Sequence, residues 1–199
     1  MPTRKPPTTA AELIKRLNAD PEWVKARQAK DAAIAVQTER LRREQEPLLR
    51  DLAAAGFPVR TVWDLVNARS PYTRALPILL NHLDKPYADR TLEGIARALA
   101  VKEARAIAWE AMLANLRSND FKGDAASALV VAISAMARPE DLPRLIELIR
   151  DPSLGQKRIH LVRNLTRSRQ KAARETLLHL RYDPDLEIEI AARLKRSAR

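Results

Sequence analysis

The chain contains no cysteine, so it has no disulfide, no thiol nucleophile and no thiolate ligand for a metal. No segment approaches the roughly 18 consecutive apolar residues that a membrane-spanning helix requires. The first seven residues place two basic side chains among prolines, with no apolar stretch after them, so they do not resemble a secretory signal. These absences predict a cytoplasmic location and no membrane association.

Glycine and aromatic residues are also scarce, with four glycines, three tryptophans, three tyrosines and two phenylalanines. Alanine, leucine and arginine are abundant instead, and their side chains lose little rotamer freedom in a helix. Hydrophobic residues make up 46% of the chain, which is enough to build a packed core. The composition therefore predicts an all-α protein.

Motifs that bind cofactors or metals are missing. Neither of the glycine-rich phosphate loops, GxGxxG or GxxxxGK[ST], occurs in the sequence. The three histidines are His82, His160 and His179, and no two of them have the close spacing that would let them converge on zinc. We expect no metal, no cofactor and no catalytic residue, and hence no enzyme activity.

The N-terminal region carries two helix-start signals. Residues 1–8 hold three prolines and two basic side chains, and we expect them to form a disordered basic arm. Thr9 and Glu12 then have the spacing of a capping box, in which each side chain satisfies a backbone N–H of the other residue. Asp20, followed by proline, has the form of a helix N-cap.

We expect a helical extension over residues 9–46, because this stretch is rich in alanine and charge and poor in large apolar groups. Pro47 predicts a break or kink at the end of this extension. Residues 47–199 then form the predicted repeat domain.

Leucine pairs recur in the second half of the chain at steps of 33, 32 and 32 residues: Leu80 and Leu83, Leu113 and Leu116, Leu145 and Leu148, Leu177 and Leu180. A second series recurs every 33 residues: Ile95, Ala128, Leu161 and Leu194. Turn residues separate the two series: Asp84-Lys85-Pro86, Ser118-Asn119-Asp120, Asp151-Pro152 and Asp183-Pro184. A fixed period of helix, turn and helix is typical of an α-solenoid, in which stacked hairpins bury a continuous core. We predict an α–α superhelix of about five hairpins.

These residues resemble HEAT repeats over roughly residues 47–196. The resemblance rests on a proline early in the first helix (Pro77, Pro143), on the aspartate–proline turns, and on a basic residue early in the second helix (Arg90, Arg158). It implies a scaffold that holds proteins or nucleic acids on a curved surface.

Positive charge is concentrated near the C-terminus. Residues 151–199 hold twelve basic and six acidic side chains, a net of +6 within the whole-chain net charge of +11. Residues 157–174 contain no acid. Clustered cations repel one another unless something neutralises them, and arginine forks suit phosphate or carboxylate. The predicted polyanion- or partner-binding residues are Lys157, Arg158, His160, Arg163, Arg167, Arg169, Lys171 and Arg174.

We therefore expect a non-enzymatic scaffold that binds an acidic macromolecular partner, either a protein or a nucleic acid, through its basic C-terminal repeats. In the alternative, the cluster is a solvated face that neighbouring acids such as Asp185, Glu187 and Glu189 partly neutralise. If nucleic acid binds, its affinity should fall steeply with salt because counterions are released.

A remote alternative comes from the stretch that begins at Trp63. Alkylpurine DNA glycosylases of the HEAT-like class carry a similar Trp-Asp-x-Val-Asp stretch, and the resemblance implies that the last aspartate is catalytic. This chain has Asn67 at that position, without a carboxylate, which disfavours the glycosylase. Val59, Val62, Trp63 and Val66 instead have the spacing of one helix face. Gly94, within a predicted helix, is expected to allow close approach of a neighbouring helix.

Overall fold

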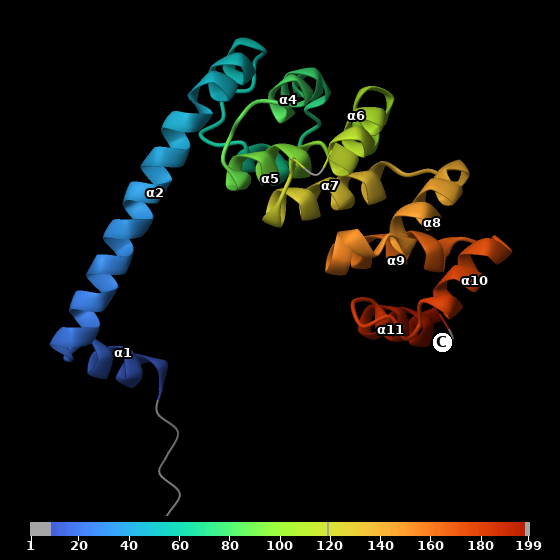
Figure 1. Cartoon of the computed structure of the whole chain (residues 1–199). Coiled ribbons are helices and arrows are strands. Elements are labelled where there is room, and N and C mark those ends of the chain that lie inside the picture. Colours follow the sequence, from blue (N-terminus) through green and yellow to red (C-terminus); the bar gives the residue numbers. More distant parts are fainter. Residues whose placement is uncertain (1–8, 119, 198–199) are drawn as a thin grey trace, which may run out of the picture. The chain divides into compact units, whose positions relative to one another are not determined.

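The computed structural model describes residues 9–118 and 120–197, and this part of the chain is all-helical (Figure 1). It contains eleven α-helices, four short 3₁₀ helices and no β-strand among the described residues. The all-α prediction is therefore confirmed. None of the described helices is both long and apolar enough to span a bilayer. The basic arm predicted over residues 1–8 lies outside the described residues.

The chain divides into two compact units, of which the first ends at Arg43 and the second begins at Glu44. The first unit contains α1 (Ala10–Asn18) and the larger part of α2 (Pro21–Ala54). Both predicted start signals are confirmed. The Thr9 hydroxyl accepts a hydrogen bond from the Glu12 N–H while the Glu12 carboxylate accepts one from the Thr9 N–H, and Asp20 accepts one from the second residue of α2. No residue of α1 is buried.

The break expected near Pro47 is wrong as a helix boundary, because α2 continues through this proline to Ala54. Packing around the proline accounts for the continuity. Leu48 and Leu52 are fully buried on either side of the following turn, and the Gln45 side chain accepts a hydrogen bond from the Val62 N–H at 3.1 Å. Tertiary packing of this kind stabilises a helix against a local cost.

The helix predicted from the valine and tryptophan spacing is shorter than expected. α3 covers only Trp63–Val66, and Val59 lies outside it. The Asp64 carboxylate accepts hydrogen bonds from the N–H groups of Arg60 and Thr61, at 2.9 and 3.4 Å. The Asp64 carboxylate thus satisfies backbone N–H groups without helical hydrogen bonds, which accounts for a helix that begins only at Trp63.

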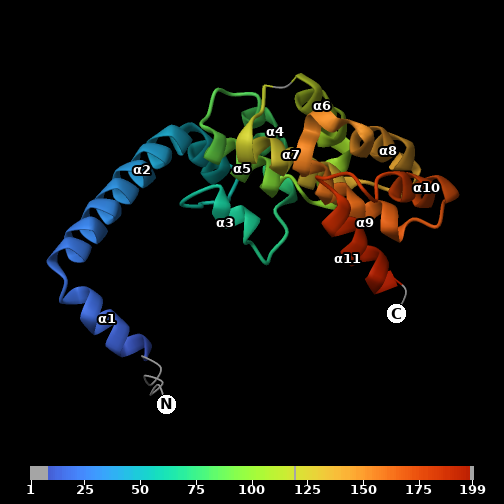
Figure 2. The same ribbon diagram turned by 60° about the horizontal axis from the view of Figure 1, so that its bottom comes forward.

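The second unit continues with eight α-helices, and the predicted turns at Asp84, Asp151 and Asp183 fall between the helices of successive pairs. The predicted turn at residues 118–120 includes Asn119, which lies outside the described residues. These helices are α4 (Leu76–Leu83), α5 (Asp89–Ala98), α6 (Arg105–Ser118), α7 (Gly123–Met136), α8 (Leu142–Arg150), α9 (Ile159–Arg167), α10 (Lys171–His179) and α11 (Glu187–Ser197). α5 packs on α7, α7 on α9 and α9 on α11, while α4 contacts α6 and α8 contacts α10. This succession can be followed in Figures 1 and 2.

Most of the recurring apolar residues lie in the core. Ile95, Ala128 and Leu161 are fully buried, and the leucines of the first series are buried or half-buried. Leu194, the last member of the second series, is 39% exposed and differs from the expectation. No described helix follows α11 to cover this side chain.

α7 is the central helix of the second unit. Eight of its fourteen residues are buried, and it packs against α5, α6 and α9. A helix that is apolar on most of its circumference is stable only when neighbours surround it. Its N-terminus is capped from the preceding hairpin, because the Asp89 carboxylate accepts hydrogen bonds from the Asp124 and Ala125 N–H groups at 3.2 Å each.

The close approach expected at Gly94 is present. A Cβ atom at this position would collide with the Cγ1 atom of Val62 and would lie 3.1 Å from Nε1 of Trp63. The missing side chain therefore lets α3 lie directly against α5, and the two helices are in contact.

Replacement of Gly94 by alanine tests this contact. Helix propensity alone would stabilise the protein by up to about 1 kcal/mol, whereas overpacking should lower the free energy of unfolding by about 1–3 kcal/mol. We expect destabilisation in urea melts. When Val62→Ala has already removed the colliding Cγ1 atom, Gly94→Ala should lower the free energy of unfolding by less than it does in the unmodified protein. Stabilisation by Gly94→Ala would contradict the close packing.

Candidate functional site

An open groove of about 1030 Å³ is lined by residues of α7, α8, α9 and α11, all within the second unit. We call it the basic groove. Its basic residues are Lys102, Arg138, Arg163, Arg167, Arg169 and Arg193, which we call the edge cations. Its apolar residues are Val131, Ala135, Ala137, Leu142, Leu145 and Ile159, which we call the floor because they are buried or half-buried. Glu189 is its one acidic residue.

Four edge cations have no acidic partner. Among the described residues no carboxylate lies within 4.0 Å of a side-chain nitrogen of Lys102, Arg163, Arg167 or Arg169. Acids near the groove already have basic partners: Asp141 lies 2.8 Å from Arg105, and Glu189 lies 2.6 Å from Arg193. The groove therefore keeps an uncompensated positive charge.

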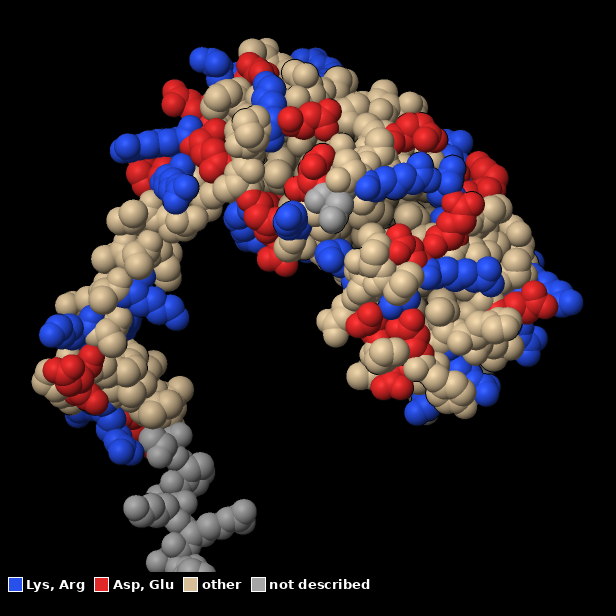
Figure 3. All heavy atoms as spheres, in the orientation of Figure 1, with Lys and Arg blue, Asp and Glu red and all other residues tan. Residues whose placement is uncertain are grey.

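Charge is distributed differently over the outer surface. On the face of the second unit that Figure 3 shows, basic and acidic side chains are interspersed, and neither sign covers the surface alone. Interspersed charges screen one another, whereas a concave site lined by one sign focuses the field. The cations of the groove, four of which have no acidic partner among the described residues, therefore suit it to attract an anion.

The amphipathic pattern of α9 positions two of the edge cations. Leu161, Val162 and Leu165 are buried and fix one side of this helix in the core. Arg163 and Arg167 are both exposed and lie four residues apart, so their side chains are neighbours on one helix face. The sequence-based placement of these two arginines on an exposed face is confirmed.

The polar face of α9 was expected to point away from the core, but part of it contacts α7. The Nε2 atom of His160 lies 3.1 Å from the Ser127 hydroxyl. The Asn164 side chain donates to the Ser134 carbonyl at 3.0 Å and accepts from the Ser134 hydroxyl at 2.6 Å. These bonds hold α9 against α7 and fix the groove between them.

His160 lines the groove without adding to its charge at neutral pH. Burial lowers the pKa of His160, the nearby positive charge of Arg97 lowers it further, and Glu189 opposes this shift. The residue was predicted as part of a cationic cluster. It lines the groove, where its lowered pKa favours the neutral imidazole and its Nε2 atom lies within hydrogen-bonding distance of the Ser127 hydroxyl.

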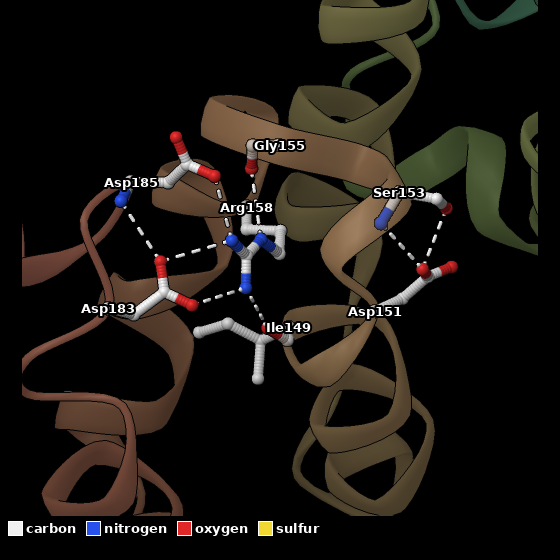
Figure 4. A network of polar contacts seen from close by, with 7 residues as sticks. All are labelled: Ile149, Asp151, Ser153, Gly155, Arg158, Asp183 and Asp185. Carbon is white, nitrogen blue, oxygen red and sulfur yellow. Dashed lines mark hydrogen bonds and ion pairs between the residues drawn. The ribbon is translucent and has the colours of Figure 1, made fainter.

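Arg158 differs from the predicted role of a surface contact, since only 2% of it is exposed. All five of its N–H donors are used. They reach the carbonyls of Gly155 and Ile149 and the carboxylates of Asp183 and Asp185, at 2.9–3.3 Å (Figure 4). The guanidinium therefore ties the turn before α9 to the turn before α11, and it cannot bind a partner.

The remaining predicted cations lie outside the groove. Lys157, Lys171 and Arg174 are not among its lining residues, and Lys171 pairs with Glu175 at 3.4 Å. Three edge cations were missed: Lys102, Arg138 and Arg193. They come from three separate segments of the sequence, outside the acid-free run, so no local pattern of charge marked them.

Nothing in the described residues forms a metal site, because no group of three or more potential ligands converges there. The Asn67 side chain donates to the Trp63 carbonyl at 2.9 Å and thereby caps α3. Trp63 is half-buried against the core, and the Arg90 guanidinium stacks 3.9 Å from its ring centroid. Both residues of the glycosylase-like stretch thus have structural contacts of their own.

Replacement of Arg158 by alanine should strongly destabilise the second unit, because it leaves Asp183 and Asp185 without their cation. Removing one partner of a buried ion pair costs about 3–5 kcal/mol. The two carboxylates are 18% and 33% exposed, so we expect a loss of about 3 kcal/mol in urea-induced unfolding. Arg163→Ala, the matched exposed control, should change the free energy of unfolding by less than about 0.5 kcal/mol. Equal effects of the two substitutions would contradict the assignment.

The pKa of His160 predicts a pH dependence of stability. An unfolded histidine titrates near pH 6.5, and the folded residue titrates lower, so the unfolded state binds more protons between these two values. The free energy of unfolding should therefore fall as the pH drops from 7 through this window. In His160→Gln, which keeps a hydrogen-bonding group near Ser127, this part of the slope should disappear. An unchanged slope from pH 7 to pH 5 would show that His160 is not the group responsible.

Comparison of the chain with models of protein families, with curated proteins and with solved structures finds no match in any of the three.

Proposed function

We propose that this protein is a non-enzymatic scaffold of the HEAT-like α-solenoid type that binds an acidic macromolecular partner in the basic groove. The observation that carries the proposal is the excess of cations over acids at this one concave site. Six basic side chains and one acid line it, and four of the six have no acidic partner among the described residues.

The solenoid assignment is supported by two features. The sequence repeats its apolar positions every 32–33 residues, and the second helices of the pairs contact one another in order from α5 to α11. In a stack of this kind each hairpin completes the core of its neighbour. Scaffolds of this architecture commonly bind partners along the row of second helices, from which α7, α9 and α11 supply most of the groove.

A binding role fits the chemistry of the groove better than catalysis. Its side chains are mainly guanidinium groups and aliphatic residues, neither of which transfers protons or forms covalent intermediates near neutral pH. The glycosylase alternative is disfavoured further by Asn67, whose amide is already engaged with Trp63.

A charge-reversal experiment tests the proposal. The probe is a fluorescent 20-residue polyglutamate, and its affinity is measured by anisotropy at low and at high salt. We expect binding that weakens with salt. The triple variant Arg163→Glu, Arg167→Glu, Arg169→Glu should bind at least about tenfold more weakly, which corresponds to about 1.4 kcal/mol.

The matched control is Arg40→Glu, Arg42→Glu, Arg117→Glu, which changes the net charge equally at exposed positions outside the groove. It should bind within about twofold of the unmodified protein, since distant exposed charges are screened. If both triple variants lose the same affinity, attraction depends on net charge alone, and the groove is not the site.

A further inference from the structure

The apolar floor of the basic groove indicates which chemical class of acidic partner fits it best. A site for a bare polyanion needs only cations, yet six of the residues that line this groove are apolar. Val131, Ala135 and Ile159 remain partly exposed within it. Apolar surface that stays in contact with water gains free energy when another apolar group covers it.

Among the described residues that line the groove there is no phenylalanine, tyrosine or tryptophan. Proteins that bind single-stranded nucleic acid without sequence preference stack bases on aromatic residues along a basic channel. A nucleic acid in this groove would have phosphate contacts, but its bases could stack only on the His160 ring and on arginine guanidinium planes. A polypeptide, in contrast, supplies both aliphatic side chains for the floor and carboxylates for the edge cations.

Arginine supplies most of the charge at the edge, with Lys102 as the exception. The planar guanidinium matches a carboxylate through two parallel hydrogen bonds. Arg163 and Arg167 lie one helical turn apart on α9, so they can contact two carboxylates on the same side of a bound segment.

We infer that the basic groove binds an acidic amphipathic segment of a partner protein, with aliphatic side chains on the floor and carboxylates at the edge cations. This inference rests on the proposed function and adds the chemical class of the partner. The segment combines two recognition modes, apolar anchors in a groove and acidic groups on an arginine cluster.

The experiment compares three probes on the full-length protein at the same ionic strength. The first is a 20-residue peptide with leucines at helical spacing and glutamates elsewhere. The second has the same glutamates, with glutamine in place of every leucine. The third is a 20-nucleotide oligothymidylate. We expect the leucine peptide to bind about tenfold more tightly than the glutamine peptide and more tightly than the oligonucleotide.

A floor variant locates the apolar contribution. Val131→Thr and Ile159→Thr together replace a methyl and an ethyl group by hydroxyl groups and so make this part of the floor polar. This variant should lose the preference for the leucine peptide while its affinity for the glutamine peptide changes less than about twofold. If its melting temperature shows that it does not fold, the comparison of the two peptides on the unmodified protein still decides the question.

The outcomes separate this inference from the proposed function. Equal affinity for the two peptides, or tighter binding of the oligonucleotide, would overturn the inference while leaving an acidic partner in place. Failure of all three probes to bind would overturn both proposals. A preference for the leucine peptide that the floor variant retains would show that the peptide binds elsewhere.

Discussion

The guanidinium of Arg158 connects three parts of the second unit that are separate in sequence. It bonds to the end of α8 through Ile149, to the turn before α9 through Gly155, and to the turn before α11 through two aspartates. A buried arginine is stable only when its donors are satisfied and its charge is compensated. Because α11 supplies both Glu189 and Arg193 to the groove, Arg158 helps to position that wall together with the packing of α11 on α9.

Pairing of charges also explains why the groove is basic. The acids closest to it are used in structural pairs, Asp141 with Arg105 and Glu189 with Arg193, and the two aspartates before α11 neutralise Arg158. The edge cations left without an acidic partner are Lys102 and the arginines on the exposed face of α9 and just after its C-terminal end. The positive charge of the groove thus has two causes. Residues 157–174 contain no acid, and the acids named above are already paired with other cations.

Much of the local structure could be predicted from the sequence. Helix starts at Thr9 and Asp20 follow from side chains that act within a few residues, and the turns between paired helices follow from aspartate, proline and glycine. The helix through Pro47 could not be predicted in this way, because the contacts that offset the proline come from residues such as Val62, far along the chain.

The candidate site was predictable only in part, for the same reason. Arg163, Arg167 and Arg169 stand out in an acid-free run, and they do line the groove. Arg158 lies in the same run, and its partners Asp183 and Asp185 are 25 and 27 residues away. The sequence indicated Asp185 as an acid that could neutralise the cluster, but not that Arg158 is the cation it pairs with. Lys102, Arg138 and Arg193 join the site solely through packing of the helices.

The most direct test of the central claim is hydrogen–deuterium exchange of the full-length protein with and without the leucine–glutamate peptide. If the peptide binds in the basic groove, we expect it to slow exchange in residues 131–145, 159–170 and 187–195, which line the groove or adjoin it. Protection confined to residues 10–43, or to the helices on the other side of the second unit such as α4 and α6, would contradict it.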